Sequence, residues 1–317
     1  MRLSVIIPTY NRAPILARCL RALRVQTAAS GSFEVIVADD GSQDGTRTEV
    51  AALTAETPGI RYLHQENAGA NRARNRAIAA SRGELLLLIN DDTIPTPTMI
   101  EHHLDAHMRH PDDRIAVLGR VTVHPELPHS RLAPLHLDRA FVGLDTVREL
   151  DWRAFFTCNI SLKKSLLLRG GLFEEGIRYH EDLELAERLS HHGLRVLYRP
   201  EALGYHDHYL TEDEFFAIAA REARALAIWA GLAPRLLPVL AEFGYEPALS
   251  AGRRMLHRMV DLAVNPLTLP LWKGIARNCP QTLDAVAVRL YLRLYHCVKR
   301  AHLRRELDTS RDEGGHP

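Results

Sequence analysis

The sequence predicts an α/β fold, a mostly parallel open sheet flanked by helices, followed by an α-helical C-terminal region. In the first half of the chain, short apolar runs alternate with segments of helical spacing, and acidic residues directly follow two of the runs. Strands that alternate with helices of about a dozen residues are typical of parallel crossovers. From Thr211 onward strand signals vanish and Ala, Leu and Arg dominate, which predicts helices.

The predicted elements follow one another with short connections. We expect strands at 3–7, 33–38, 60–64, 84–89 and 115–123, and helices at 14–26, 44–53, 70–81 and 97–109. The first of these helices has apolar residues spaced three and four apart, which predicts one buried side. Further along, we expect a Pro-rich loop at 125–138, an extended segment at 155–162, a helix at 181–192 and a strand from 195.

These patterns predict a soft boundary near residue 210. We expect residues 1–210 to form the α/β domain, residues 211–307 a helical region and residues 308–317 a polar, disordered tail.

Composition narrows the classes of partner. The chain has 317 residues, of which 46% are hydrophobic, so it is long enough to bury a substantial core. Lys and Arg together number 40 against 39 for Asp and Glu, a balance that gives no reason to expect nucleic acid as a partner. The four cysteines have no CxxC spacing, which disfavours a zinc cluster or a disulfide framework and fits a reducing compartment.

The sequence predicts a cytoplasmic location. The start has one basic residue and too short an apolar run for a signal peptide, and no stretch reaches the roughly 18 apolar residues of a membrane-spanning helix. A peripheral position on the inner face of a membrane stays open.

Asn90-Asp91-Asp92 is the most informative segment, because it follows the apolar run 85–89 directly. Two like charges at the end of a strand are best stabilised by a cation, and their oxygen atoms suit Mg²⁺ or Mn²⁺. Asp39-Asp40 ends the run 35–38 in the same way. In open α/β sheets ligands bind beyond the carboxyl ends of the strands, so both pairs are expected at one site. The alternative for each pair is a capped turn.

Three further groups carry candidate chemistry. Glu181-Asp182 begins a predicted helix, where a carboxylate can act as a general base or simply complement the helix dipole. His206 and His208 alternate in an extended segment, which allows a metal ligand or two ordinary surface histidines. Arg74, near a helix start, is suited to holding phosphate oxygens, and a solvated basic face is the alternative.

The remaining motifs give weaker indications of function. The histidines between 102 and 110 lack an HExxH pattern, so we interpret them as structural or exposed. The sequence contains no GxGxxG and no GxxxxGK[ST], so it gives no support to a dinucleotide-binding site or a P-loop. Near the C-terminus, Arg289, Arg293, Arg300 and Arg304 fall within about 60° of one another on a helix, a face that either rests on anionic lipid or packs within the protein. We favour packing.

Taken in order, five segments between residues 3 and 208 resemble family-2 glycosyltransferases. They are 4–12 (SVIIPTYNR), 37–46 (VADDGSQDGT), 67–75 (NAGANRARN), 90–92 (NDD), and the stretch from 159 to 193 with NISL, GGLFEE and EDLEL. The resemblance implies the GT-A fold, a Rossmann-like open sheet, and makes residues 1–210 the catalytic domain. Asn90 departs from the family's DxD motif, which usually begins with Asp.

Carried over by position, the resemblance implies a role for each candidate residue. Asp182 is implied as the catalytic base with Glu181 beside it, and Asp92 as the ligand of Mg²⁺ or Mn²⁺ with His206 completing the metal site. The residues implied to contact the nucleotide or its diphosphate are Pro8, Tyr10, Asp39, Asp40, Arg74, Asn90 and Asp91.

The function expected from the resemblance is inverting transfer of a sugar from a nucleotide-diphosphate donor, UDP- or dTDP-linked, to an acceptor hydroxyl. The acceptor is expected to be a glycan or lipid-linked glycan in surface polysaccharide or glycolipid synthesis. A catalytically weak sugar- or nucleotide-binding module stays open because of Asn90, and a nucleotidyltransferase is disfavoured because no Gly-rich basic loop follows the first strand. Membrane contact and a homo-oligomer also stay open.

Overall fold

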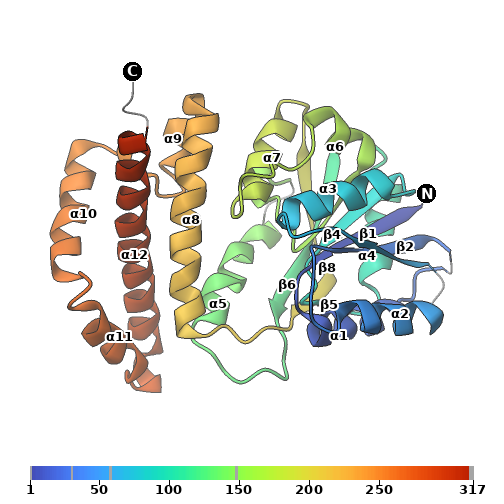
Figure 1. Ribbon diagram of the computed structural model, residues 1–317, viewed down its shortest axis with the longest axis horizontal. Coiled ribbons are helices and arrows are strands. Elements are labelled where there is room, and N and C mark those ends of the chain that lie inside the picture. The colour runs from blue at the N-terminus through green and yellow to red at the C-terminus, as the bar shows by residue number, and fades with distance from the viewer. Residues whose placement is uncertain (1, 30, 57–58, 147–148, 314–317) are drawn as a thin grey trace. The chain divides into compact units, whose positions relative to one another are not determined.

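The structure, a computed structural model, describes residues 2–29, 31–56, 59–146 and 149–313. It divides into two compact units. Unit 1 comprises Met1–Pro128 and Leu137–His208, and unit 2 comprises His129–His136 and Tyr209–Pro317. Figure 1 shows the helices and strands of both units.

Unit 1 is built on a mixed open sheet whose order is β3-β2-β1-β4-β7-β6-β8-β5. Parallel pairs join β1 to β2 and β4, β2 to β3, and β6 to β8, whereas β7 runs antiparallel to β4 and β6, and β5 antiparallel to β8. The strands are β1 (Leu3–Thr9), β2 (Phe33–Asp39), β3 (Ile60–His64), β4 (Leu85–Ile89), β5 (Thr93–Pro95), β6 (Ile115–Val123), β7 (Asn159–Lys163) and β8 (Arg195–His206).

Helices cover both faces of this sheet. The helices of unit 1 are α1 (Ala13–Arg24), α2 (Thr46–Glu56), α3 (Ala70–Ala80), α4 (Met99–Arg109), α6 (Lys164–Gly170) and α7 (Glu181–Ser190), with short 3₁₀ turns η1 (Asp138–Phe141), η2 (Leu144–Thr146) and η3 (Trp152–Ala154). Successive side chains of a strand point to opposite faces, so the buried strands of this sheet feed two cores. Ile6 packs with α3, α6 and α7, whereas Val5 and Ile7 pack with α1, α2 and α4.

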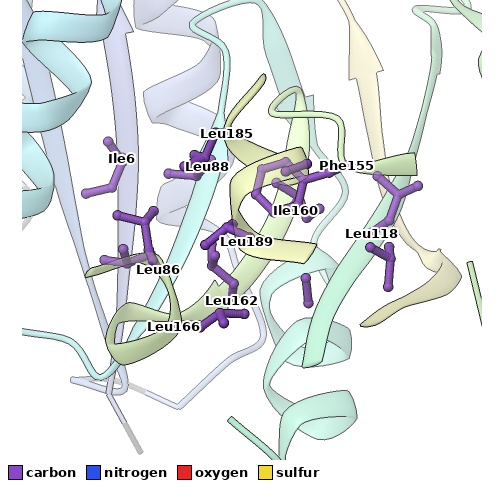
Figure 2. Close-up of a cluster of buried hydrophobic side chains, with 14 of the residues drawn as sticks. Ile6, Leu86, Leu88, Leu118, Phe155, Ile160, Leu162, Leu166, Leu185 and Leu189 are labelled. Carbon is purple, nitrogen blue, oxygen red and sulfur yellow. The ribbon is translucent and has the colours of Figure 1, made fainter. Parts of the chain in front are cut away.

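The first of these cores is drawn in Figure 2. Leu86 and Leu88 from β4 meet Ile160 and Leu162 from β7, and Leu189 from α7 closes over them. All of these side chains are at most 1% exposed, so the core fixes α7 against the sheet. That packing sets the position of the acidic residues at the start of α7.

Unit 2 consists of helices. They are α5 (Ala133–His136), α8 (Glu212–Leu232), α9 (Leu237–Leu240), α10 (Ala251–Ala263), α11 (Leu269–Arg277) and α12 (Asp284–Glu313), with 3₁₀ turns η4 (Pro234–Leu236), η5 (Glu246–Ala248) and η6 (Gln281–Leu283). Helix α8 begins with a capping box in which Thr211 and Glu214 satisfy each other's backbone N–H groups. Helix α12 packs against α8, α10 and α11 (Figure 1).

The predicted open α/β sheet and the helical C-terminal region are confirmed, and the differences concern short or terminal elements. Three short elements were not predicted: β5, α6, and α5, which lies inside the loop expected at 125–138. Elements of three to seven residues carry too little periodicity to be recognised. Helix α12 continues to Glu313, past the end expected at Leu307, since no Gly or Pro occurs before Gly314. Residues 314–317 of the predicted tail lie outside the described residues.

The histidines of α4 belong to the interior, as expected for structural residues. His103 and His107 are fully buried and reach β7, where both contact the Ser161 hydroxyl, at 2.8 and 2.9 Å. His103 Nε2 lies 2.9 Å from Asn159 Oδ1, an oxygen that only accepts, so this nitrogen carries the proton. The Ser161 hydroxyl then donates to His103 Nδ1 and accepts from His107 Nε2. Burial keeps both imidazoles neutral by lowering the pKa of His103 to about 4 and that of His107 to about 3.

Within the described part of the chain, no helix combines the length and apolar composition needed to cross a bilayer.

Candidate active site

The carboxyl ends of β1, β2 and β4 meet because the three strands are parallel neighbours. Asp40 donates its backbone N–H to the Thr9 carbonyl at 2.9 Å, and the Thr9 hydroxyl donates to Asp91 Oδ2 at 2.8 Å. The end of β1 therefore joins the two acidic pairs that follow β2 and β4.

Asp39 supports the turn after β2. Its carboxylate accepts the Ser42 N–H at 2.9 Å and the Tyr62 hydroxyl, and it lies 3.3 Å from His64 Nδ1. Burial acts to raise the pKa of Asp39, but these hydrogen bonds outweigh burial and lower it. Asp39 is 1% exposed, so it shapes the loop and does not face solvent.

Asp40 holds the start of α3. Its carboxylate accepts backbone N–H groups of Ala68 and Gly69, each at 2.8 Å, and the side-chain amide of Gln65 at 2.7 Å. Gly41, at φ +87°, must be glycine here, because a Cβ would lie 2.7 Å from the Asn67 nitrogen. Asp40 thus fixes the loop that precedes Arg74.

Asp91 and Asp92 are both buried and share one cation. Arg12 Nη1 lies 2.9 Å from Asp91 Oδ1, and Arg12 Nη2 lies 2.9 Å from Asp92 Oδ2. Burial, with the neighbouring charge of Asp92, nevertheless raises the pKa of Asp91 to about 6. The pair is therefore short of positive charge even with Arg12 in place.

The environment of Asp92 fits a divalent cation. Asp92 Oδ1 is buried without a hydrogen-bond partner, and His206 Nε2, at the end of β8, lies 3.5 Å from Asp92 Oδ2. Among the described residues no group of three or more His, Cys, Asp and Glu side chains is gathered closely enough to hold a metal by itself. A carboxylate with substrate phosphate oxygens and water is the usual arrangement for Mg²⁺, and His206 would add one nitrogen to it.

Arg74 links the strand ends to α7. It is buried, and its guanidinium lies 2.9 Å from Glu181 Oε1 and 3.5 Å from Asn90 Oδ1. The ring of Phe173 lies 5.5 Å below the same guanidinium, which adds a cation–π contact. The Arg74 side chain therefore joins α3, the end of β4 and the start of α7.

Asp182 is a partly buried carboxylate next to a second acid. Burial, together with the charge of Glu181, raises the pKa of Asp182 to about 7, although the Leu183 N–H donates to its Oδ1 at 2.8 Å. The charges of Asp182 and Asp92 both act on Cys158, where burial and then these charges raise the thiol pKa to about 12. Cys158 therefore lies within electrostatic range of both acids, which links α7 with the end of β4.

Two non-glycine residues of the described chain adopt positive φ, and both border this region. Asn11 (φ +51°) follows β1, and His180 (φ +60°) precedes Glu181. Such conformations cost free energy, and they concentrate at functional sites. Asn11 is held by Ser42 and Gln43, whose side-chain oxygen and backbone N–H bond to it at 2.8 Å each.

The structure links most of the predicted site residues through direct contacts. Direct contacts connect Asp40, Arg74, Asn90, Asp91, Asp92, Glu181 and His206 either to one another or to the same loops. Asp39 bonds to the turn that follows β2. Pro8 is buried within β1, and Tyr10 after it is half-exposed. Thr9 and Arg12, which bind the acidic residues after β4, had no predicted role. Both lie in the segment between the first predicted strand and the first predicted helix, which was the signal available for them.

Comparison with known proteins identifies similar chains. The sequence model described as "Glycosyl transferase family 2" matches residues 4–167. A validoxylamine A glucosyltransferase of Streptomyces hygroscopicus is 34% identical over 232 residues, which cover 64% of this chain and 54% of that protein. An uncharacterised glycosyltransferase of Bacillus subtilis is 30% identical over 260 residues, covering 66% of this chain and 65% of that protein. The chain thus spans between about half and two thirds of these relatives.

Solved structures share the fold at low sequence identity. The mannosyltransferase PcManGT from Pyrobaculum calidifontis, in complex with GDP-Man and Mn²⁺, gives a TM-score of 0.66 at 19% identity and covers 95% of this chain and 86% of that one. Residues 1–349 of TarS from S. aureus, in complex with UDP, give 0.53 at 16% identity and cover 96% of this chain and 92% of that one. These likenesses confirm the predicted GT-A fold.

Proposed function

This chain belongs to glycosyl transferase family 2, and from that premise we propose that it moves a sugar from a nucleotide-diphosphate donor to an acceptor hydroxyl with inversion. The observation that most supports the proposal is Asp182, a carboxylate with a pKa of about 7. Like Asp92, it lies close enough to Cys158 for its charge to act on that thiol. A base is most effective when its pKa lies near the working pH.

The donor side of the site is assigned to the loops after β1 and β2. Pro8, Tyr10 and Asp40 border the nucleobase, and Asp39 supports the turn beneath it. Asp40 is already bonded to the loop before α3, so it acts mainly by shaping this wall. The solved structures with this fold carry GDP-Man or UDP, which supports a nucleotide-sugar donor, and we propose UDP or dTDP as the nucleotide.

The diphosphate of the donor is assigned to the neighbourhood of Arg74. Arg74 is buried and fixed by Glu181, so its guanidinium offers preorganised donors to phosphate oxygens. Asn90 and Asp91 lie beside it. Asp92 and His206 would hold Mg²⁺ or Mn²⁺, which when bound acts as a Lewis acid toward the leaving diphosphate. Arg12 bonds to the other oxygen of Asp92, Oδ2, so its positive charge competes with the metal for this carboxylate.

The transfer itself is assigned to Asp182. Its carboxylate removes the proton of the acceptor hydroxyl as the oxygen bonds to the anomeric carbon. The bond from that carbon to the diphosphate oxygen breaks on the opposite face, and the electron pair leaves with the nucleoside diphosphate. Glu181 does not take the proton in this scheme, because its charge is committed to Arg74.

We propose residues 1–210 as the catalytic domain and 211–307 as a helical region. The two compact units divide the chain near the same boundary, except that His129–His136 belong to unit 2. We propose a glycan or lipid-linked glycan as the acceptor, in surface polysaccharide or glycolipid synthesis.

One observation favours the second candidate function, a catalytically weak nucleotide- or sugar-binding module. Arg12 spans both carboxylates, Asp91 and Asp92, beside Asn90, so a metal must compete with this cation.

The deciding experiment screens nucleoside diphosphates by thermal shift with and without Mn²⁺, because a selective ligand raises the apparent stability. Calorimetry on Asp92→Ala then tests the metal site, with the exposed Asp213→Ala as the control. We expect Asp92→Ala to lose Mn²⁺-dependent binding, and unchanged affinity would refute the metal role. Slow hydrolysis of the selected nucleotide sugar by the wild type separates the enzyme from the binding module, which would bind without turnover.

A further inference from the structure

Helix α10 of unit 2 packs by its polar side. Asp261 accepts from Arg300 and from Arg304 of α12, the latter at 2.8 Å, and Arg254 donates to the carbonyls of Pro247 and Leu249. None of the side chains of α10, all of which are described, is buried. The apolar side of this helix therefore has no core to pack into.

The exposed side of α10 is continuous and apolar. Met255, Met259 and Leu262 fall within about 60° of one another on the helix, and they are 67%, 62% and 78% exposed. Leu256 and Val260 widen the same side. Monomeric proteins rarely expose contiguous apolar surface on this scale without a binding role.

Helix α11 carries a second exposed row. Leu267 just before it, Leu271 and Ile275 recur every four residues, and they are 91%, 64% and 48% exposed. Between this helix and α12 lies an apolar groove of about 220 Å³, lined by Leu269 and Val298 among others. We call the exposed apolar residues of α10, of α11 and of their connection the α10–α11 face, comprising Met255, Leu256, Met259, Val260, Leu262, Leu267, Leu271 and Ile275.

The charges that flank the apolar side of α10 are positive. Residues 249–283 contain five Arg and Lys residues and a single acid, Asp261, which pairs with α12. Of the five cations, Lys273 and Arg277 pair with Glu212 of α8, and Arg254 donates to backbone carbonyls. Arg253 and Arg258 are exposed on the two flanks of the apolar side. An apolar helix side with cationic flanks is the arrangement that rests in the headgroup region of an anionic bilayer.

The basic residues of α12 that the sequence offered for lipid contact are in part already used. Arg300 is buried against Asp261, and Arg304 is bound by Glu246 at 2.7 Å. Tyr291 and Leu294 on the other side of the helix are buried, so α12 packs within unit 2. The apolar side of α12 is therefore used inside unit 2, whereas the apolar residues of α10 and α11 are exposed.

We propose that the α10–α11 face binds the surface of a bilayer that contains anionic phospholipid. The apolar residues enter the boundary between headgroups and acyl chains, and Arg253 and Arg258 contact lipid phosphates. A second copy of the chain is the less suitable occupant, because its own face would bring the same positive charges together. The proposal does not depend on the proposed function, since vesicle binding needs neither donor nor acceptor.

The test is flotation of the full chain with vesicles of phosphatidylcholine alone or with phosphatidylglycerol, at low and high salt. Met259→Glu with Leu262→Glu removes the apolar contact, and Met108→Glu with Leu168→Glu is the matched control, because these residues of α4 and α6 are 65% and 54% exposed. Arg253→Glu with Arg258→Glu tests the charges. All variants are also assayed for nucleotide binding, which should not change.

We expect the wild type and the control to float with anionic vesicles, and the α10 variant to float at least tenfold less. The Arg variant should lose the preference for anionic lipid, and salt should weaken wild-type binding. Wild-type protein that stays unbound at low salt, or an α10 variant that floats normally, would overturn the proposal. So would a dimer, seen by sedimentation without lipid, that the α10 variant abolishes.

Discussion

Arg74 Nη1 lies 2.9 Å from Glu181 Oε1, and this ion pair joins the helix that begins at the Asp40 loop to the helix that carries Asp182. Both side chains are shielded, with 7% and 17% of their surface exposed. The pair therefore couples the wall assigned to the nucleotide with the residue assigned to proton transfer, and it commits Glu181 to a positioning role.

Replacing Asp182 by Asn should lower turnover by about 10² to 10⁴, the usual contribution of a general base, because the amide cannot take the acceptor proton. Nucleotide diphosphate affinity, measured by calorimetry, should stay within about twofold. Asp213→Asn, an exposed acid in α8, is the control and should be active. Near-normal turnover of Asp182→Asn would show that another group acts as the base.

The activity of the wild type should rise with pH and level off above about 7. Asp182 must be ionised to act, and its raised pKa of about 7 means that activity falls roughly tenfold per unit below that value. Glu181→Gln removes a charge that raises this pKa, so the profile should move to lower pH by up to about one unit. Glu184→Gln, a nearby acid bound to Arg188, should leave the profile in place. An unshifted Glu181→Gln profile would contradict the assignment.

Arg12→Gln should strengthen Mn²⁺ binding by about tenfold, since it removes a cation that lies 2.9 Å from each of Asp91 and Asp92. Titration calorimetry in the absence of nucleotide measures this directly. Arg18→Gln is the control, because Arg18 pairs with Asp207 and not with the strand end after β4. Weaker Mn²⁺ binding by Arg12→Gln would mean that Arg12 supports the metal site and does not compete with the metal.

The stability of the protein should fall as pH drops below about 6.5, the ordinary pKa of histidine. Buried His103 has a folded pKa of about 4, so protonation favours the unfolded chain, at a cost of about 2 kcal/mol at pH 5. The contribution is fully present above pH 6.5 and lost on acidification. Denaturant unfolding of His103→Gln should show a weaker pH dependence, whereas the partly exposed His102→Gln should behave as the wild type. Equal pH dependence in both variants would exclude His103 as the cause.

The sequence was sufficient for the main elements, because their burial is visible locally. A buried strand such as Leu85–Ile89 is a continuous apolar run, and an amphipathic helix such as Ala13–Arg24 has apolar residues three and four apart. It also located the acidic pairs, since carboxylates directly after apolar runs are visible without a fold. Its interpretation of His103 and His107 as structural agrees with their burial.

What the sequence by itself determined was an α/β fold of the glycosyl transferase family 2 type, with chemistry at the strand ends and helices after them. Only the tertiary structure decided which side chains pair, because residues such as Arg12 and Asp92, or Arg74 and Glu181, are far apart in the chain. The same holds for α10, whose apolar side has the periodicity of a packed helix. Periodicity reports that a helix has two sides, and the neighbouring helices alone determine which side is covered.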